Sequence, residues 1–186
     1  QQVLILGMGG SAIGGDIAKV IVQDKCSVPI FINRSYSIPK WVNDGTLVLA
    51  SSYSGNTEET LSAFEQCYER SCPIIILSTG GMLIDHAMDK DLDRIKIPSG
   101  FQPRAALGFS FTLILLILRY FKFIPASIIS DVKKSILPLE ELQKNISHSD
   151  SLVLQIANKI HDTCPIIYGS ADLGWVVALR FSGQLA

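Results

Sequence analysis

Hydroxyl side chains cluster in the stretch Ser51–Thr60, where an apolar run gives way to a helical pattern. Leu47–Ala50 has the composition of a buried strand, and the apolar residues after the cluster recur at helical spacing. Free backbone N–H groups and the positive end of a helix dipole meet at such a turn. Because Ser52, Ser54 and Thr57 add hydroxyl donors there, the stretch is suited to holding a phosphate monoester.

The same cluster is also typical of an ordinary helix start. Ser, Thr and Asn commonly cap the first turn, and acidic residues such as Glu58 and Glu59 are favoured there. Either glutamate would repel a phosphate if it pointed inward, so we expect both to face solvent. Capping and phosphate binding are both open on this stretch alone. A nucleophile is not indicated, because no histidine is near and no Gly-x-Ser-x-Gly elbow is present.

A glycine-rich turn, Gly7–Ala12, follows another short apolar run and opens a helical pattern. It fits the G-x-G-x-x-G/A dinucleotide pattern loosely. The acidic residue that would bind the ribose is missing, because the second strand ends in Asn33–Arg34. Arg34 is compatible with a 2′-phosphate, so NADP binding is one alternative. The others are a backbone approach to a sugar and simple close packing of helix on strand.

Apolar runs and helical patterns alternate through the first hundred residues. Strands are predicted at Val3–Leu6, Val28–Ile32, Thr46–Ala50, Pro73–Leu77 and Asp93–Ile97. This alternation indicates a parallel sheet covered on both faces. The predicted fold is therefore an α/β, three-layer α-β-α sandwich around a five-stranded parallel sheet.

A further glycine turn, Ser78–Gly81, ends the fourth predicted strand. All three turns lie at the carboxyl ends of parallel strands, where open α/β sheets bind ligands. Three polar, glycine-bearing loops at one edge are more than helix starts require. The hydroxyl cluster therefore favours phosphate binding over capping alone.

The composition excludes several classes of partner. The net charge of the 186 residues is −1, from 16 basic and 17 acidic side chains, so no field is present to hold nucleic acid or an anionic membrane. The longest uncharged run, between Arg104 and Arg119, is shorter than the roughly 20 residues of a membrane-spanning helix. Four cysteines without metal-ligand spacing are expected to be thiols in a reducing cytoplasm: Cys26, Cys67, Cys72 and Cys164.

Helical patterns then extend towards the end of the chain. They are predicted at Leu107–Tyr120, at Ile128–Asn145 with a kink or break at Pro138, at Ser151–His161 and at Leu173–Leu185. The apolar strand Pro165–Tyr168 and the turn after it repeat the chain's own opening. We therefore expect a first domain over residues 1–122, a helical linker over 123–162 and the start of a truncated, similar domain over 163–186. The chain opens inside a core strand without an initiator Met, which favours a fragment.

Four motifs follow one another in order: Gly7–Ser11, Ser52–Thr57, Ser78–Gly81 and Pro103–Ala106. Together they resemble the sugar isomerase (SIS) domain, which has a flavodoxin-like fold. The Gly-Met-Gly-Gly-Ser opening and the Pro-Arg-Ala-Ala turn are more closely similar to those of the bifunctional phosphoglucose/phosphomannose isomerases. The resemblance covers nearly the whole chain.

The resemblance implies a role for each matching residue. Ser52, Ser54 and Thr57 correspond to phosphate-binding positions, and Gly9, Gly10 and Ser11 to the loop that lies against the sugar. Arg104 corresponds to an arginine that stabilises the charge of an enediolate. On position alone, Arg104 could instead be a surface arginine that caps a turn.

The implied reaction is aldose–ketose isomerisation of glucose 6-phosphate, and also mannose 6-phosphate, to fructose 6-phosphate through a cis-enediolate. It needs an acid/base, a carbon-proton base and a positive charge, but no metal or redox cofactor. The family's base is a glutamate after a Gln-Leu stretch. Arg180–Ala186 matches that lead-in, so we expect the base just beyond it. None of the three histidines matches a catalytic position of the family: His86, His148 and His161.

The resemblance also implies a cytoplasmic homodimer acting in glycolysis and gluconeogenesis. The alternative is a non-catalytic SIS module that binds and senses a sugar phosphate. Such a module would keep the hydroxyl cluster and lack the base.

Overall fold

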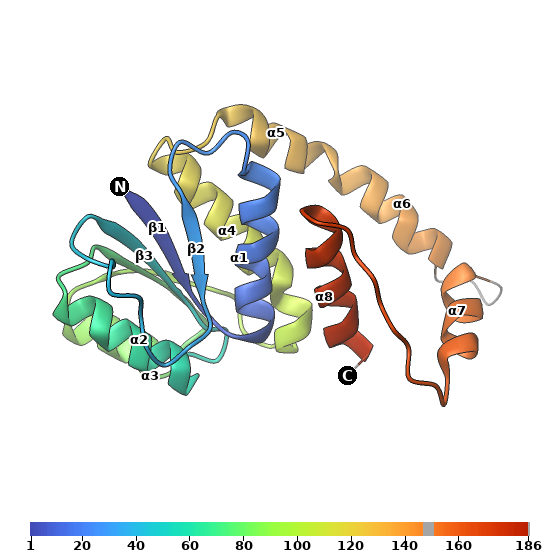
Figure 1. Cartoon of the computed structure of the whole chain (residues 1–186), viewed down its shortest axis with the longest axis horizontal. Helices are drawn as coiled ribbons and strands as arrows, with labels where there is room; N and C mark the ends of the chain where they lie inside the picture. The colour runs from blue at the N-terminus through green and yellow to red at the C-terminus, as the bar shows by residue number, and fades with distance from the viewer. Residues whose placement is uncertain (147–150, 186) are drawn as a thin grey trace.

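A computed structural model describes residues 1–146 and 151–185 of the protein. One parallel sheet contains β1 (Gln2–Leu6), β2 (Ile30–Asn33), β3 (Thr46–Ser51), β4 (Ile74–Ser78) and β5 (Asp93–Lys96). The strand order is β2-β1-β3-β4-β5 (Figure 1). This is the flavodoxin-like order, in which the direction of winding reverses between β1 and β3. The five strands predicted from the apolar runs are confirmed.

The central strands end level with one another at one edge of the sheet. Leu6 of β1 pairs with Ala50 of β3, and Ser51 of β3 pairs with Leu77 of β4. Every residue of β3 is buried, because helices cover both faces of the sheet. The loops that leave β1, β3 and β4 therefore start from neighbouring points.

Two pairs of helices cover the sheet: α1 (Gly9–Val22) and α4 (Leu107–Tyr120) on one face, α2 (Glu58–Glu69) and α3 (Gly81–Asp89) on the other (Figure 1). Side chains of β3 alternate between the two layers, as a strand requires. Leu47 and Leu49 pack towards α1 and α4, while Val48 and Ala50 pack towards α2 and α3. The predicted three-layer sandwich is confirmed.

The stretch Pro103–Tyr120, which joins the short helix η1 (Pro103–Ala106) to α4, is long and apolar enough to cross a membrane by length and composition alone. A core helix of a soluble protein passes the same test. Ile114, Leu115 and Leu118 are at most 1% exposed and pack in the layer between the sheet and α1. These are the contacts of a core helix.

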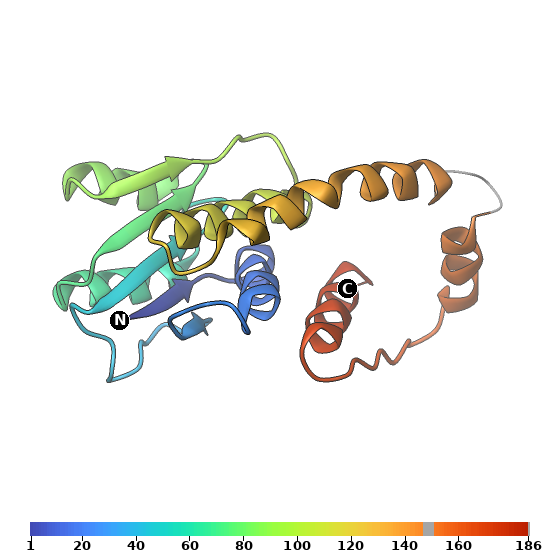
Figure 2. The ribbon, with the colours of Figure 1, turned by 90° about the horizontal axis from the view of Figure 1, so that it is seen from above.

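Three further helices lead away from the sheet: α5 (Ala126–Lys134), α6 (Ile136–Ile146) and α7 (Leu152–Ile160) (Figure 2). The helical pattern predicted over 128–145 is interrupted at Ser135, because Pro138 has no N–H to donate to the carbonyl of Lys134. Ile124 and Ile128 are buried in the core beneath α4, whereas every residue of α6 is exposed. The packed first unit thus extends past residue 122, and the domain limits given above stay a prediction.

The strand predicted at Pro165–Tyr168 is wrong. Residues 164–170 have no secondary structure, and the segment is separated from the sheet by α8 (Leu173–Leu185) (Figure 1). A strand needs a neighbouring strand to satisfy its backbone groups, and none lies beside this segment among the described residues. The helix after it forms within the predicted bounds and packs along α1, with Val176 buried. Whether a second domain begins here stays a prediction.

The contact between α1 and α4 depends on Gly14. A Cβ at this position would lie 3.0 Å from the Cβ of Ser110 and 3.1 Å from the backbone N of Phe111. We expect Gly14→Ala to lower the free energy of unfolding by about 1–3 kcal/mol, because the backbone of α4 must move. Gly108→Ala is the matched control: this helical glycine faces open space, so alanine should raise stability by about 0.5–1 kcal/mol. Urea unfolding checks both, and an equal effect at the two positions would contradict the close contact.

Candidate functional site

The loop after β3 holds the hydroxyl groups of Ser52 and Thr57 together. Ser52 is 2% exposed, and its Oγ lies 2.9 Å from the Oγ1 of Thr57. The backbone N–H of Gly55 donates to the same Ser52 oxygen over 3.1 Å. These bonds close the loop into a compact turn at the start of α2, where the N–H groups of the first helical turn point outward.

Thr57 occupies the N-cap position of α2, yet its side chain accepts no capping hydrogen bond. A capping threonine accepts an N–H from the second or third helical residue. Here the hydroxyl is turned towards Ser52 instead. The capping alternative therefore does not describe Thr57, and the positive end of α2 is left open beside two hydroxyl groups.

Ser54 lies on the outside of the same loop. Its side chain is exposed, and its Oγ accepts the backbone N–H of Asn56 over 3.2 Å. Because the Ser54 oxygen is the acceptor in this bond, the hydroxyl proton does not take part in it. Ser54 thus exposes its hydroxyl group to solvent, whereas Ser52 is buried.

The turn after β4 supports the loop Ser52–Thr57, called the hydroxyl loop below, by direct backbone contact. Gly55 has a φ of +74°, and a Cβ on it would collide with the carbonyl oxygen of Gly80. The Asn56 side-chain oxygen accepts the N–H of Met82 over 2.9 Å, at the start of α3, and the Gly55 carbonyl accepts the N–H of Leu83 over 3.0 Å. The Ser78–Gly81 motif thus acts as a buttress for the hydroxyl loop. Sequence reasoning missed Asn56, because its partner lies 26 residues away.

The turn after β1 lies against the turn that carries Arg104. α1 begins at Gly9, within the predicted turn Gly7–Ala12, so part of the glycine turn forms the first helical turn. A Cβ on Gly10 would lie 3.1 Å from the carbonyl oxygen of Pro103. Gly10 and Ser11 line a small pocket together with Tyr53, Pro103 and Ser110. The loops after β1 and β3 therefore flank the point where the winding reverses, which is where doubly wound sheets bind ligands.

Arg104 itself is exposed in η1, at the same edge. Its backbone carbonyl accepts a hydrogen bond from the guanidinium of Arg180 on α8, and the Gln184 amide lies against that guanidinium. Among residues 1–146 and 151–185, no hydrogen bond or ion pair is found for the Arg104 guanidinium itself. The structure thus holds the backbone of Arg104 and leaves its charge available to a ligand.

No model of a protein family matches the chain. A bifunctional phosphoglucose/phosphomannose isomerase of Caldicellulosiruptor bescii is 42% identical over 194 residues, covering 100% of the chain and 56% of that protein. A protein of the same name from Aquifex aeolicus is 33% identical over 186 residues, covering 100% of the chain and 55% of that protein. The chain belongs to the bifunctional phosphoglucose/phosphomannose isomerase family.

The chain spans about half the length of the family members it matches. It is also 31% identical over 186 residues to a D-glucosamine-6-phosphate 4-epimerase of Sulfolobus acidocaldarius, covering 100% of the chain and 56% of that protein. The isomerase and the epimerase both carry a sugar phosphate in their names. The sugar phosphate is therefore the ligand class common to these relatives.

Solved structures share the SIS fold. The C-terminal domain of glucosamine-fructose-6-phosphate aminotransferase from Francisella tularensis superposes with a TM-score of 0.69 at 18% identity, over 99% of this chain and 54% of that chain. Tagatose-6-phosphate ketose/aldose isomerase from Escherichia coli gives a TM-score of 0.55 at 17% identity, over 74% and 42%. At these identities the likeness shows the fold alone.

Arg34 does not serve the dinucleotide alternative. Its guanidinium donates to the carboxylate of Asp16, a buried residue of α1. Burial raises the pKa of the Asp16 carboxyl, and the charge of Arg34 opposes that rise. The arginine that was compatible with a 2′-phosphate thus serves as the counterion of Asp16.

Two carboxylates follow the hydroxyl loop directly, at the start of α2. Glu58 is exposed as predicted, and its carboxylate accepts the hydroxyl of Tyr36 over 3.3 Å. Glu59 is half-buried, which differs from the prediction that it faces solvent. His86 is half-buried, with its Nδ1 3.4 Å from the carboxylate of Glu65. His161 is exposed next to its neighbour Asp162, and His148 lies outside the described residues.

The described cysteines behave as thiols. Cys67 and Cys72 are buried, Cys26 is half-buried and Cys164 is exposed; all four are free. Burial raises the pKa of Cys67 to about 12, so that thiol is protonated and inert at neutral pH. Within the described part of the chain, no group of three His, Cys, Asp or Glu side chains could hold a metal ion.

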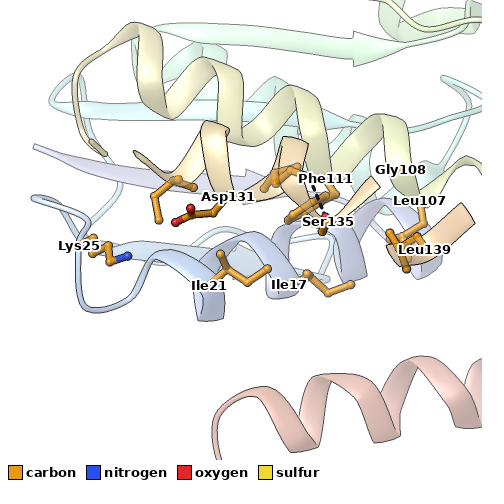
Figure 3. A pocket seen from close by; sticks show the side chains of 11 residues that line it. Ile17, Ile21, Lys25, Leu107, Gly108, Phe111, Asp131, Ser135 and Leu139 are labelled. Carbon is orange, nitrogen blue, oxygen red and sulfur yellow. Dashed lines mark hydrogen bonds between the residues drawn. The ribbon is translucent and has the colours of Figure 1, made fainter. Parts of the chain in front are cut away.

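An apolar groove lies away from the sheet edge. It has a volume of about 670 Å³ and lies between α1, α4 and the helices α5 and α6 (Figure 3). Ile17, Ile21 and Phe111 make its walls apolar, and only Lys25 and Asp131 bring charge to it. A sugar phosphate needs donors, so this groove lacks the chemistry that the loop after β3 offers.

The ion pair between Asp16 and Arg34 should make stability depend on pH. We expect Arg34→Met to lower the free energy of unfolding by about 2–3 kcal/mol near pH 7, because it leaves a buried carboxylate without its counterion. Solvent already screens the partly exposed arginine, so the cost is smaller than for a fully buried pair. A raised pKa means that Asp16 takes up its proton in the folded state above its ordinary value of 3.8, so the cost should shrink as the pH falls towards that value.

Urea unfolding between pH 4 and pH 8 measures this dependence. In an Asp16→Asn background, Arg34→Met should lose its pH dependence. A cost that is the same at both ends of the range in the Asp16 protein would rule out the ion pair.

Proposed function

We propose that this chain holds a sugar 6-phosphate, and that the protein interconverts glucose 6-phosphate, and also mannose 6-phosphate, with fructose 6-phosphate through a cis-enediolate. The observation that carries the proposal is the loop after β3. Its Ser52 and Thr57 hydroxyls lie together at a helix start that Thr57 does not cap. The name of the Caldicellulosiruptor bescii relative supports the reaction.

The proposed roles follow from the positions of the groups. Ser52, Ser54 and Thr57 bind the phosphate, whose charge is favoured by the N-terminus of α2. Gly9, Gly10 and Ser11 lie against the sugar, across the point where the winding reverses. The phosphate anchors the far end of the substrate, so the reacting carbons are held at a fixed distance from the loop.

Arg104 is proposed to stabilise the enediolate oxygen. Negative charge develops on that oxygen only as the proton leaves carbon, so a fixed cation beside it lowers the barrier. Arg104 is exposed, and its backbone carbonyl accepts a hydrogen bond from Arg180. The carbon-proton base is proposed to come from outside the described residues, after the Gln184–Leu185 lead-in. No cofactor is needed for these steps, since only protons move.

The setting of the enzyme is part of the proposal. A cytoplasmic homodimer that works in glycolysis and gluconeogenesis, without nucleic-acid or membrane partners, fits the near-neutral charge of the chain. Residues 163–186 are proposed to begin a second SIS domain.

A coupled assay tests the reaction. The complete gene product, incubated with fructose 6-phosphate without added metal, should form glucose 6-phosphate and mannose 6-phosphate. Binding of fructose 6-phosphate in calorimetry with no turnover would favour the alternative, a sensing module. The protein should also be incubated with glucosamine 6-phosphate. Epimerisation at C4, without isomerisation of fructose 6-phosphate, would assign the chemistry of the Sulfolobus relative.

The Ser54 hydroxyl should contribute directly to phosphate affinity. We expect Ser54→Ala to weaken binding of glucitol 6-phosphate, which has no carbonyl to isomerise, by roughly 1.5–3 kcal/mol through loss of a charge-assisted hydrogen bond. Ser62→Ala, one turn into α2, is the control, because its hydroxyl donates to the carbonyl of Tyr36. Isothermal titration calorimetry measures both, and unchanged affinity in the Ser54 variant would refute the phosphate assignment.

Arg104 should act on the transition state more than on binding. We expect Arg104→Ala to lower kcat about 10²–10³-fold, the usual effect of removing one group that stabilises an oxyanion, with a smaller rise in KM. Arg119→Ala, at the other end of α4, should leave both constants unchanged. Steady-state kinetics of the complete protein separates the two constants. A raised KM with normal kcat would instead make Arg104 a ground-state binding residue.

A further inference from the structure

The side chain of Tyr53 connects the hydroxyl loop to the segment that leads to Arg104. Its hydroxyl donates to the carbonyl of Pro98 over 3.1 Å and accepts the backbone N–H of Phe101 over 3.0 Å. Pro98 and Phe101 follow β5 and stand just before η1. One hydroxyl group thus bridges both sides of the turn that precedes Arg104.

The base of this bridge is firmly held. The Tyr53 carbonyl accepts both the N–H and the hydroxyl of Thr79, over 3.2 and 2.7 Å. The preceding N–H, that of Ser52, donates to the carbonyl of Leu77 over 3.1 Å. The backbone of Tyr53 is therefore bonded to the end of β4, next to the hydroxyl groups proposed to hold the phosphate.

The far side of the bridge depends on Tyr53 more than on regular structure. Residues 98–102 are exposed and lie in neither helix nor strand, and Gly100 has a φ of +97°. The ring of Phe101 packs on that of Phe109 with 5.5 Å between centroids, which holds the side chain but not the backbone. Tyr53 also lines a small pocket together with Pro103, the residue before Arg104.

We propose that Tyr53 is a positioning residue, which acts through Arg104 and couples the phosphate end of the site to the charge at the reacting end. This inference rests on the proposed function. Because the Arg104 guanidinium has no partner among the described residues, only its backbone sets where the charge lies. The Tyr53 hydroxyl holds Pro98 and Phe101, in the segment that leads into η1, and Arg180 holds the carbonyl of Arg104 itself from the side of α8.

The test uses Tyr53→Phe in the complete protein, with two ligands that differ at C1. Glucitol 6-phosphate is neutral there, whereas 6-phosphogluconate carries a carboxylate that probes the charge of Arg104. We expect Tyr53→Phe to reduce the preference for 6-phosphogluconate about tenfold and kcat by a similar factor, the size of one or two lost hydrogen bonds. Affinity for glucitol 6-phosphate and KM for fructose 6-phosphate should stay within about twofold, because the phosphate loop is intact.

Two comparisons make the result specific. In an Arg104→Ala background, Tyr53→Phe should change kcat and ligand preference by no more than about twofold, since the group it acts through is gone. Tyr36→Phe is the matched control. It removes a tyrosine hydroxyl bonded to Glu58 at the start of α2 and should change neither quantity.

Four outcomes would overturn the inference. Equal weakening of both ligands by Tyr53→Phe would make Tyr53 a structural part of the phosphate loop. A full effect in the Arg104→Ala background would show that it does not act through Arg104. An unchanged Tyr53→Phe enzyme, with normal melting temperature, would refute the coupling but leave the proposed function standing. A wild-type protein that neither isomerises fructose 6-phosphate nor prefers 6-phosphogluconate would overturn the proposed function itself, and this inference with it.

Discussion

The candidate site depends on the parallel pairing of β1, β3 and β4. Leu6 pairs with Ala50 and Ser51 with Leu77, so the three strands end level and release their loops from one edge. The winding reverses between β1 and β3, which places the loops after these two strands on either side of the position where doubly wound sheets bind ligands. A slip of one residue would exchange the two faces of a strand and bury its polar end in the wrong layer. The buried alternation of β3 prevents that slip.

Hydrogen bonds within the edge loops organise the site before any ligand is present. Thr57 gives up its capping bond and faces Ser52, while Asn56 caps the start of α3 and Gly55 lies against Gly80. A preformed loop loses little conformational entropy when it binds a phosphate. The loop is ordered when the protein folds, and contacts between the ends of β3 and β4 offset the conformational entropy that it loses.

The charge of Arg104 is placed by the backbone on either side of it. Tyr53 reaches that backbone from the hydroxyl loop, and Arg180 reaches it from α8, a helix that packs on α1. The small helix η1 also touches Gly10, so the turn after β1 contributes to the same arrangement. The proposed isomerisation needs the phosphate and the developing oxyanion to be held at a constant separation. A network that joins the two ends through fixed backbone meets that need.

Local features of the sequence were sufficient for the sheet, the sandwich and the loops of the site. Apolar runs, glycine turns and Pro138 act over a few residues, so β1, β3, α4 and α8 could be predicted nearly to their bounds. The strand expected at 165–168 failed because a strand also requires partners, which periodicity does not report. Tertiary structure alone decided three pairings: the contact of the Thr57 hydroxyl with Ser52, the ion pair of Arg34 with Asp16 and the hydrogen bond of Tyr53 with Phe101. Each of these is a choice of hydrogen-bond partner, and the last joins residues 48 apart, which only the folded sheet brings together.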